Sequence, residues 1–133
     1  MKERKGTVMQ YNQELMISTG RSRKEINWKQ ISIFWSEFIE KFRNPVRSRE
    51  TIQEYKALPK AQQDELKDVG GFVGGTLKGS RRTSGNIADR CLITLDMDNI
   101  PAGGTEDILK RVDGLGCAYL IYSTRKHESA APR

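Results

Sequence analysis

Two aspartates of the 133-residue chain, Asp96 and Asp98, are spaced in a way that suits metal chemistry, and they follow an apolar run at Cys91–Leu95. If this run is a strand, residues two apart point to the same face, so both carboxylates project together while Met97 turns into apolar packing. Two close carboxylates repel each other unless a cation compensates. Mg²⁺ or Mn²⁺ prefers oxygen ligands and supports phosphoryl transfer. The alternative is a pair of solvated acids at a strand end.

His127 is the single histidine of the chain, and it follows a second apolar run at Cys117–Tyr122. A capped helix starting at Thr105 and ending at Gly114 separates the two runs, which predicts a strand–helix–strand unit. Such a unit normally makes two parallel strands by a right-handed crossover, so both strands end on one sheet edge. Ligands bind at such edges, and an imidazole there suits a triphosphate oxygen. A lone histidine is as often incidental.

The first half of the chain adds one strand and several helices. Leu15–Ser18 is predicted as a strand, and Trp28–Phe42 as a helix with apolar residues on one face. A second helix over Glu50–Leu58, capped by Ser48, and a short helix over Ala61–Lys67 are expected to pack on a sheet. The glycine-rich Gly70–Gly75 favours a short strand or turn. These elements together predict a mixed α/β fold in one domain over residues 1–133, with residues 1–10 disordered.

Several function classes are excluded or disfavoured. Thr76 stands where a phosphate-binding loop needs lysine, so Gly70–Gly75 is not such a loop. Cys91 and Cys117 lack zinc-site spacing and are expected to be buried, reduced thiols. The chain shows neither a membrane-spanning run nor a secretory signal, which favours a cytoplasmic protein. Its net charge of +6 suits a polyanionic partner such as nucleic acid.

The order and spacing of two motifs resemble a known family. Leu95–Asn99 with its acidic pair, followed by Tyr122–His127, is similar to the paired motifs of the archaeo-eukaryotic primase superfamily, in its phage and prophage members. Lys67–Phe72, with Arg81 and Arg82 beyond it, resembles the region upstream of the acidic motif there. The resemblance covers the chain from about Leu15 to its end. It implies an RRM-like primase-polymerase sheet with flanking helices.

The resemblance also implies roles for individual residues. Asp96 and Asp98 would bind catalytic Mg²⁺ or Mn²⁺, and His127 would contact the incoming nucleotide. Six further residues are weaker candidates for contacts with nucleotide or template phosphates: Ser123, Thr124, Arg125, Arg81, Arg82 and Lys67. Ordinary solvated charge is the alternative for the basic ones.

The resemblance further implies partners and limits. The partners would be nucleoside triphosphates, a single-stranded DNA template and a fused or associated replicative helicase, in the cytoplasm of a bacterial host with no membrane partner. The family has a third metal-binding aspartate on a later strand. We therefore expect a catalytic domain incomplete at its C-terminus, unable to polymerise by itself.

Two other functions stay open on the sequence alone. Haloacid-dehalogenase-type phosphatases also place Asp-x-Asp after an apolar strand, with the first aspartate as nucleophile. Asn99 and Ile100 fit that pattern poorly. A basic α/β domain that binds nucleic acid without catalysis is the other alternative, although Tyr119 and Tyr122 are the only nearby aromatic residues that a base could stack on.

Overall fold

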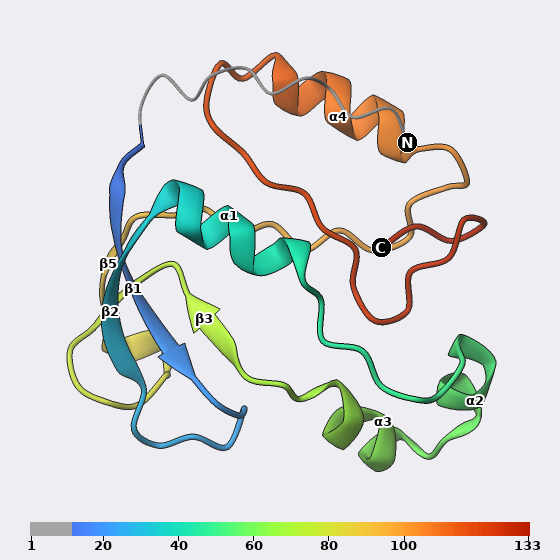
Figure 1. Cartoon of the computed structure of the whole chain (residues 1–133), viewed down its shortest axis with the longest axis horizontal. Coiled ribbons are helices and arrows are strands. Elements are labelled where there is room, and N and C mark those ends of the chain that lie inside the picture. The colour runs from blue at the N-terminus through green and yellow to red at the C-terminus, as the bar shows by residue number, and fades with distance from the viewer. Residues whose placement is uncertain (1–11) are drawn as a thin grey trace. The chain divides into compact units, whose positions relative to one another are not determined.

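A computed structural model describes residues 12–133 of the chain, and it has the mixed α/β architecture that the sequence predicts (Figure 1). Contacts divide the chain into two compact units. The sheet unit takes its described residues from 12–46 and 69–93, and the helical unit comprises 47–68 and 94–133. The predicted disorder of residues 1–10 lies outside the described residues. The single domain expected over residues 1–133 stays a prediction.

The sheet unit is built around β1 (Glu14–Gly20), the central strand of an antiparallel sheet with the order β2-β1-β3. Its neighbours are β2 (Lys29–Phe34) and β3 (Gly71–Val73). Leu15 and Ile17 are buried while the residues before each of them are exposed, which is the two-residue period of a half-buried strand. The prediction of a strand in this region is confirmed.

A two-stranded antiparallel sheet completes this unit. It pairs β4 (Gly75–Leu77) with β5 (Ile87–Arg90), and a 3₁₀ turn at Ser84–Asn86 precedes β5. The buried hydroxyl of Ser18 on β1 donates a hydrogen bond to the carbonyl of Gly75 at 3.0 Å. A Cβ on Gly75 would meet a backbone oxygen of β5 at 1.9 Å, so close pairing requires glycine here. The short strand expected within Gly70–Gly75 is confirmed.

The helix predicted over Trp28–Phe42 is correct only in its second half. Residues 29–34 form β2, and the helix α1 spans Trp35–Arg43. Ile31 and Ile33 are β-branched, alternate along the chain, and face β1 in the ladder. Pairing with β1 therefore outweighs the helical spacing that Ile31 shares with the aromatic residues after it.

Aromatic rings fix α1 to the sheet. Phe38 is buried, and its ring lies edge-to-face with Phe42 and Phe72 at centroid distances of 5.1 and 5.0 Å. Edge-to-face rings gain about 0.5–1.5 kcal/mol beyond the area that they bury. Phe38 is therefore core, as the sequence indicates, whereas Trp35 and Phe42 are half-buried.

The helical unit contains α2 (Ile52–Ala57), α3 (Lys60–Lys67) and α4 (Thr105–Asp113). Thr51, and not the predicted Ser48, caps α2: its hydroxyl accepts the N–H of Glu54 at 3.2 Å, and the Glu54 carboxylate accepts the N–H of Thr51 at 2.8 Å. This reciprocal capping box outweighs a single hydroxyl placed further upstream. Within residues 12–133, no helix is long and apolar enough to cross a membrane.

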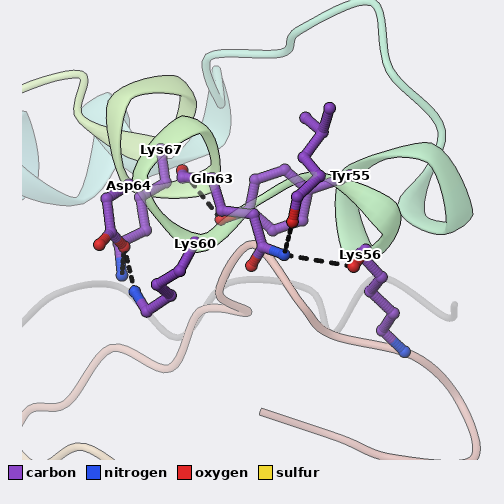
Figure 2. Close-up of polar contacts among 7 residues, drawn as sticks. Tyr55, Lys56, Lys60, Gln63, Asp64 and Lys67 are labelled. Atoms are coloured by element: carbon purple, nitrogen blue, oxygen red, sulfur yellow. Dashed lines mark hydrogen bonds and ion pairs between the residues drawn. The ribbon is translucent and has the colours of Figure 1, made fainter.

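A small core lies between α2 and α3. Tyr55 is only 1% exposed, and its hydroxyl donates to the carbonyl of Gln63 at 3.1 Å. The side-chain amide of Gln63 in turn donates to the carbonyls of Lys56 and Leu58 (Figure 2). These bonds satisfy carbonyls that the short helix α2 leaves unpaired at its end.

The two strands predicted in the second half of the chain are not formed. Cys91–Leu95 and Cys117–Tyr122 have no regular secondary structure, so the predicted parallel strand–helix–strand unit is wrong in both strands. Ile93 is 90% exposed and Leu95 70%. An apolar run becomes a strand only when another strand pairs with it, and no described strand pairs with these runs.

The prediction for the two cysteines is also partly wrong. Cys91 and Cys117 are unpaired thiols as expected, but both residues are exposed, so the prediction of burial is wrong. The Cys91 thiol donates to the carbonyl of Met16 at 3.3 Å. Partial loss of solvent around the sulfur raises the pKa of Cys91, which keeps it protonated near neutral pH.

Candidate functional site

The acidic segment lies directly before α4 in irregular backbone. Asp96 and Asp98 line an open pocket of about 460 Å³, to which α4 contributes Asp107 and Arg111. Residues four apart on a helix share a face, which explains how both α4 side chains reach one pocket. Met97 is 37% exposed, so its predicted apolar packing is wrong, because no strand pairing supplies a sheet to cover it.

Arg133 connects the acidic segment with the loop that carries the histidine. Its guanidinium Nε lies 2.9 Å from Oδ1 of Asp98, and its Nη2 contacts the same oxygen. The backbone N–H of Arg133 donates to Nδ1 of His127 at 3.2 Å. Asp98 and His127 therefore lie beside one residue, although no sheet edge brings them there.

Local backbone hydrogen bonds shape the histidine loop. The N–H of His127 donates to the carbonyl of Thr124 at 3.1 Å, and the N–H of Thr124 donates to the carbonyl of Arg133 at 3.2 Å. Glu128 and Ala131 form an antiparallel bridge within the loop. The segment from 124 to 133 therefore folds back on itself, and this returns Arg133 to the histidine.

The contact with Arg133 also defines the tautomer of His127. Nδ1 accepts a hydrogen bond, so in the neutral ring the proton sits on Nε2. The ring therefore presents an N–H donor at Nε2, which is the form that can donate to an anionic oxygen.

Arg125, a weaker candidate for phosphate contact, packs against the α2 region. Its guanidinium carbon lies 4.4 Å from the centroid of the Tyr55 ring, and its Nη2 lies 3.7 Å from a carboxylate oxygen of Glu50. The Ser48 hydroxyl lowers the pKa of Glu50 most, with Arg125 contributing less. The structure thus gives Arg125 a packing role in the helical unit. Ser123, two residues earlier, is exposed.

Lys67 lies in the last turn of α3 and takes part in an ion pair. Its ammonium group lies 3.4 Å from Oδ1 of Asp64, which Lys60 also contacts (Figure 2). Hydrogen bonding and charge from Lys60, followed by Lys67, lower the pKa of Asp64. This ion pair stays within one helix, so it gives Lys67 a partner of ordinary surface type.

Arg81 and Arg82 belong to the sheet unit, whereas the acidic pair and the histidine belong to the helical unit. The guanidinium of Arg82 lies 5.0 Å from the centroid of the Trp28 ring. The backbone carbonyl of Arg81 accepts a hydrogen bond from the side-chain amide of Asn86 at 3.2 Å. Both arginines are exposed.

The carboxylates of the acidic segment are the type of ligand that a hard divalent ion prefers. They are too few to surround such an ion by themselves. Among residues 12–133, no group of three or more histidine, cysteine, aspartate or glutamate side chains could hold a metal ion. Mg²⁺ is commonly bound by one or two carboxylates, with water and substrate phosphates completing its shell. Asp96 and Asp98 supply carboxylates of the kind that such a site uses, in one pocket.

Sequence reasoning missed three participants of this region. No motif marks Arg133, yet it contacts both Asp98 and His127. Asp107 and Arg111 lie within the predicted helix without a role assigned to them, yet both line the acidic pocket. The spacing of the α4 pair is visible in the sequence, whereas the reach of Arg133 depends on a turn that no motif marks.

The fold is mixed α/β, and one arginine contacts both an aspartate of the acidic pocket and the histidine. These features define the class of molecule only coarsely. The family model of the VapE N-terminal domain matches residues 1–133, and the chain belongs to this family. No curated protein and no solved structure matches the chain.

Proposed function

We propose that the helical unit carries the nucleotide and metal site of a nucleotidyltransferase of the primase-polymerase type. The observation that carries the proposal is the double contact of Arg133, which holds Asp98 and His127 beside one residue. Asp96 and Asp98 also share one pocket. The proposed reaction is attack of a 3′-hydroxyl on the α-phosphate of a nucleoside triphosphate; the bond from the α-phosphorus to the bridging oxygen breaks, pyrophosphate leaves, and the hydroxyl proton passes to water.

Asp96 and Asp98 are the proposed ligands of Mg²⁺ or Mn²⁺. When bound, such an ion would neutralise phosphate charge and polarise the phosphorus–oxygen bond under attack. The guanidinium of Arg133 now supplies positive charge at Oδ1 of Asp98. It stands at the oxygen that a cation would use, so binding of metal should compete with this ion pair.

His127 is the proposed donor to the triphosphate. The N–H at Nε2 can donate to a phosphate oxygen while Nδ1 stays fixed by the backbone of Arg133. Ser123 and Thr124 lie on the same loop and offer hydroxyl donors. Holding the triphosphate in this way would contribute through positioning and charge stabilisation, which dominate catalysis of phosphoryl transfer.

The proposed setting is replication of phage or mobile-element DNA in the bacterial cytoplasm. The proposed partners are nucleoside triphosphates, a single-stranded DNA template and a fused or associated replicative helicase. The resemblance of the two motifs supports these partners, and membership of the VapE N-terminal domain family is consistent with them.

Titration of the 133-residue chain with Mn²⁺ and ATP tests the proposal. Asp98→Asn should weaken Mn²⁺-dependent ATP binding by roughly tenfold or more, as expected when a ligand of the metal is lost. His127→Ala should weaken it by roughly tenfold through loss of a charge-assisted hydrogen bond. Asp113→Asn, an exposed aspartate at the end of α4, is the matched control and should leave binding unchanged.

Arg133→Gln separates the two contacts of Arg133. Every residue except proline keeps the backbone N–H that donates to Nδ1 of His127. This variant frees Asp98 while it leaves the histidine contact in place, so Mn²⁺ binding should strengthen severalfold. Equal Mn²⁺ and ATP affinity in Asp98→Asn and Asp113→Asn, with both variants folded by circular dichroism, would refute the proposed site.

A further inference from the structure

Two basic segments that lie far apart in the sequence meet in the sheet unit. The first, residues 21–29, connects β1 with β2 and includes the first residue of β2; the second, residues 78–83, follows β4. The N–H of Trp28 donates to the carbonyl of Ser80 at 2.8 Å, and the guanidinium of Arg82 lies over the Trp28 ring at 5.0 Å. One hydrogen bond and one cation–π contact thus hold the two segments side by side.

Trp28 fixes this junction from within. The residue is 8% exposed, and its indole Nε1–H donates to the carbonyl of Glu25 at 2.9 Å within the first segment. The ring lies on Gly20, where an added Cβ would come within 2.5 Å of it. Trp28 therefore belongs to the packed core of the sheet unit, so the fold itself brings the two segments together.

The charge of the chain is concentrated at this junction. The two segments hold seven of the 23 basic residues and one of the 17 acidic residues. Their net charge of +6 therefore equals that of the whole chain, and the other residues balance to zero. All seven basic residues are exposed: Arg21, Arg23, Lys24 and Lys29 in the first segment, and Lys78, Arg81 and Arg82 in the second.

The two segments contain little acidic charge of their own. Glu25 is the acidic residue of the two segments, and it lies 3.7 Å from Arg21, a distance typical of a weak surface pair. Elsewhere in the chain the numbers of basic and acidic residues are equal. The excess of positive charge thus lies in these two segments. We call residues 21–29 and 78–83 together the basic surface.

We propose that the basic surface binds the sugar–phosphate backbone of a nucleic acid strand. Exposed arginine and lysine side chains from two adjoining loops suit a run of phosphates, and arginine forms bidentate contacts with them. Trp28 is covered by Arg82 and Gly20, so its ring is not open for base stacking. Binding should therefore depend on phosphate and show little base preference. This proposal does not depend on the chemistry of Asp96 and Asp98.

Fluorescence anisotropy with a labelled twenty-nucleotide deoxythymidine strand tests the proposal, in EDTA and without nucleotide. The triple variant Arg21→Gln, Arg23→Gln, Lys24→Gln should raise the Kd at least tenfold. Each lost contact with single-stranded nucleic acid should reduce the salt slope of log K by about 0.7. Lys78→Gln with Arg81→Gln should act in the same direction while it keeps the contact between Arg82 and Trp28.

The matched control is the triple variant Lys41→Gln, Arg47→Gln, Arg90→Gln, which removes the same charge outside the basic surface. It should change the Kd less than threefold. Equal losses in both triple variants would overturn the proposal, because binding would then follow net charge alone. A ribonucleotide strand and a duplex, measured in parallel, show which form of nucleic acid backbone the surface prefers.

Two further arms complete the test. Phosphatidylserine vesicles that bind with the same variant dependence, while the oligonucleotide does not bind, would assign the surface to anionic membranes and refute the proposal. Asp98→Asn should leave oligonucleotide binding unchanged. Failure of the acidic site and failure of the basic surface are therefore distinguishable.

Discussion

Apolar residues are buried in the paired strands of the sheet unit but exposed in the irregular segments of the helical unit. In the sheet unit, Leu15 and Ile17 lie buried between paired strands. In the helical unit, Leu115, Ile121 and Tyr122 are 70%, 42% and 45% exposed in irregular backbone. The comparison teaches that apolar runs of similar composition become strands only where another segment supplies hydrogen-bonding partners. It also predicts differences in the protection of backbone amides from hydrogen exchange, in the loss of stability on substitution, and in the effect of removing a charge.

Amide hydrogen exchange should show the largest difference between the units. Amides of β1 that are bonded within the sheet, such as that of Ile17, should exchange at least roughly 1,000-fold more slowly than those of Leu95 or Ile121. Core strands open only in large unfolding events, whereas irregular exposed backbone opens freely. Exchange measured by NMR checks this. Strong protection at Leu95 or Ile121 would show that the second-half strands do form.

Core substitution should give the next largest effect. Ile17→Ala should lower the free energy of unfolding by about 2–5 kcal/mol, because it removes buried methyl groups and leaves a cavity. The same substitution at Ile93, which is 90% exposed, should change it by less than about 0.5 kcal/mol. Urea unfolding followed by circular dichroism measures both. Ile93 belongs to the sheet unit but lies outside its paired strands. Equal losses would mean that Ile93 is buried in solution and would end the contrast between paired and unpaired apolar residues.

The smallest effect is expected at a single carboxylate of the helical unit, that of Asp64. The contact with Lys60 lowers the pKa of Asp64, so the stabilisation is present above the ordinary value of 3.8 and is lost as the pH falls through the lowered pKa. Lys60→Met should raise the pKa of Asp64 toward 3.8, as followed by carboxyl NMR titration. Lys56→Met, which removes a lysine that pairs with Glu128, should leave it unchanged.

The sequence predicted the fold where local pattern and pairing agree. The short apolar run at Leu15–Ser18 marked β1, and Gly114 marked the end of α4. It misplaced the start of α1, because Ile31 has helical spacing to Trp35, while Ile31 and Ile33 together have the two-residue spacing of the strand that forms. It predicted strands at 91–95 and 117–122 from apolar composition alone, and composition carries no information about a pairing partner.

The candidate site was predictable in residue types but not in the contacts that join them. The acidic pair and the lone histidine are visible in the sequence, and both belong to the helical unit. The contact of Arg133 with Asp98 and His127 depends on a turn through residues 124–133 that no spacing rule indicates. The approach of residues 21–29 to 78–83 likewise depends on Trp28, which the sequence presented only as the start of a helix.

The chain passes from one unit to the other three times, after residues 46, 68 and 93. Each unit is therefore assembled from separate stretches of polypeptide, and severing the backbone at one crossing leaves at least one unit divided between two pieces. Loop-closure entropy grows only with the logarithm of loop length, so an insertion at a crossing should be tolerated far better than a truncation there. A reporter domain is therefore best inserted at one of these crossings, whereas shortening the chain to a single unit would require cuts at all three crossings and one new join.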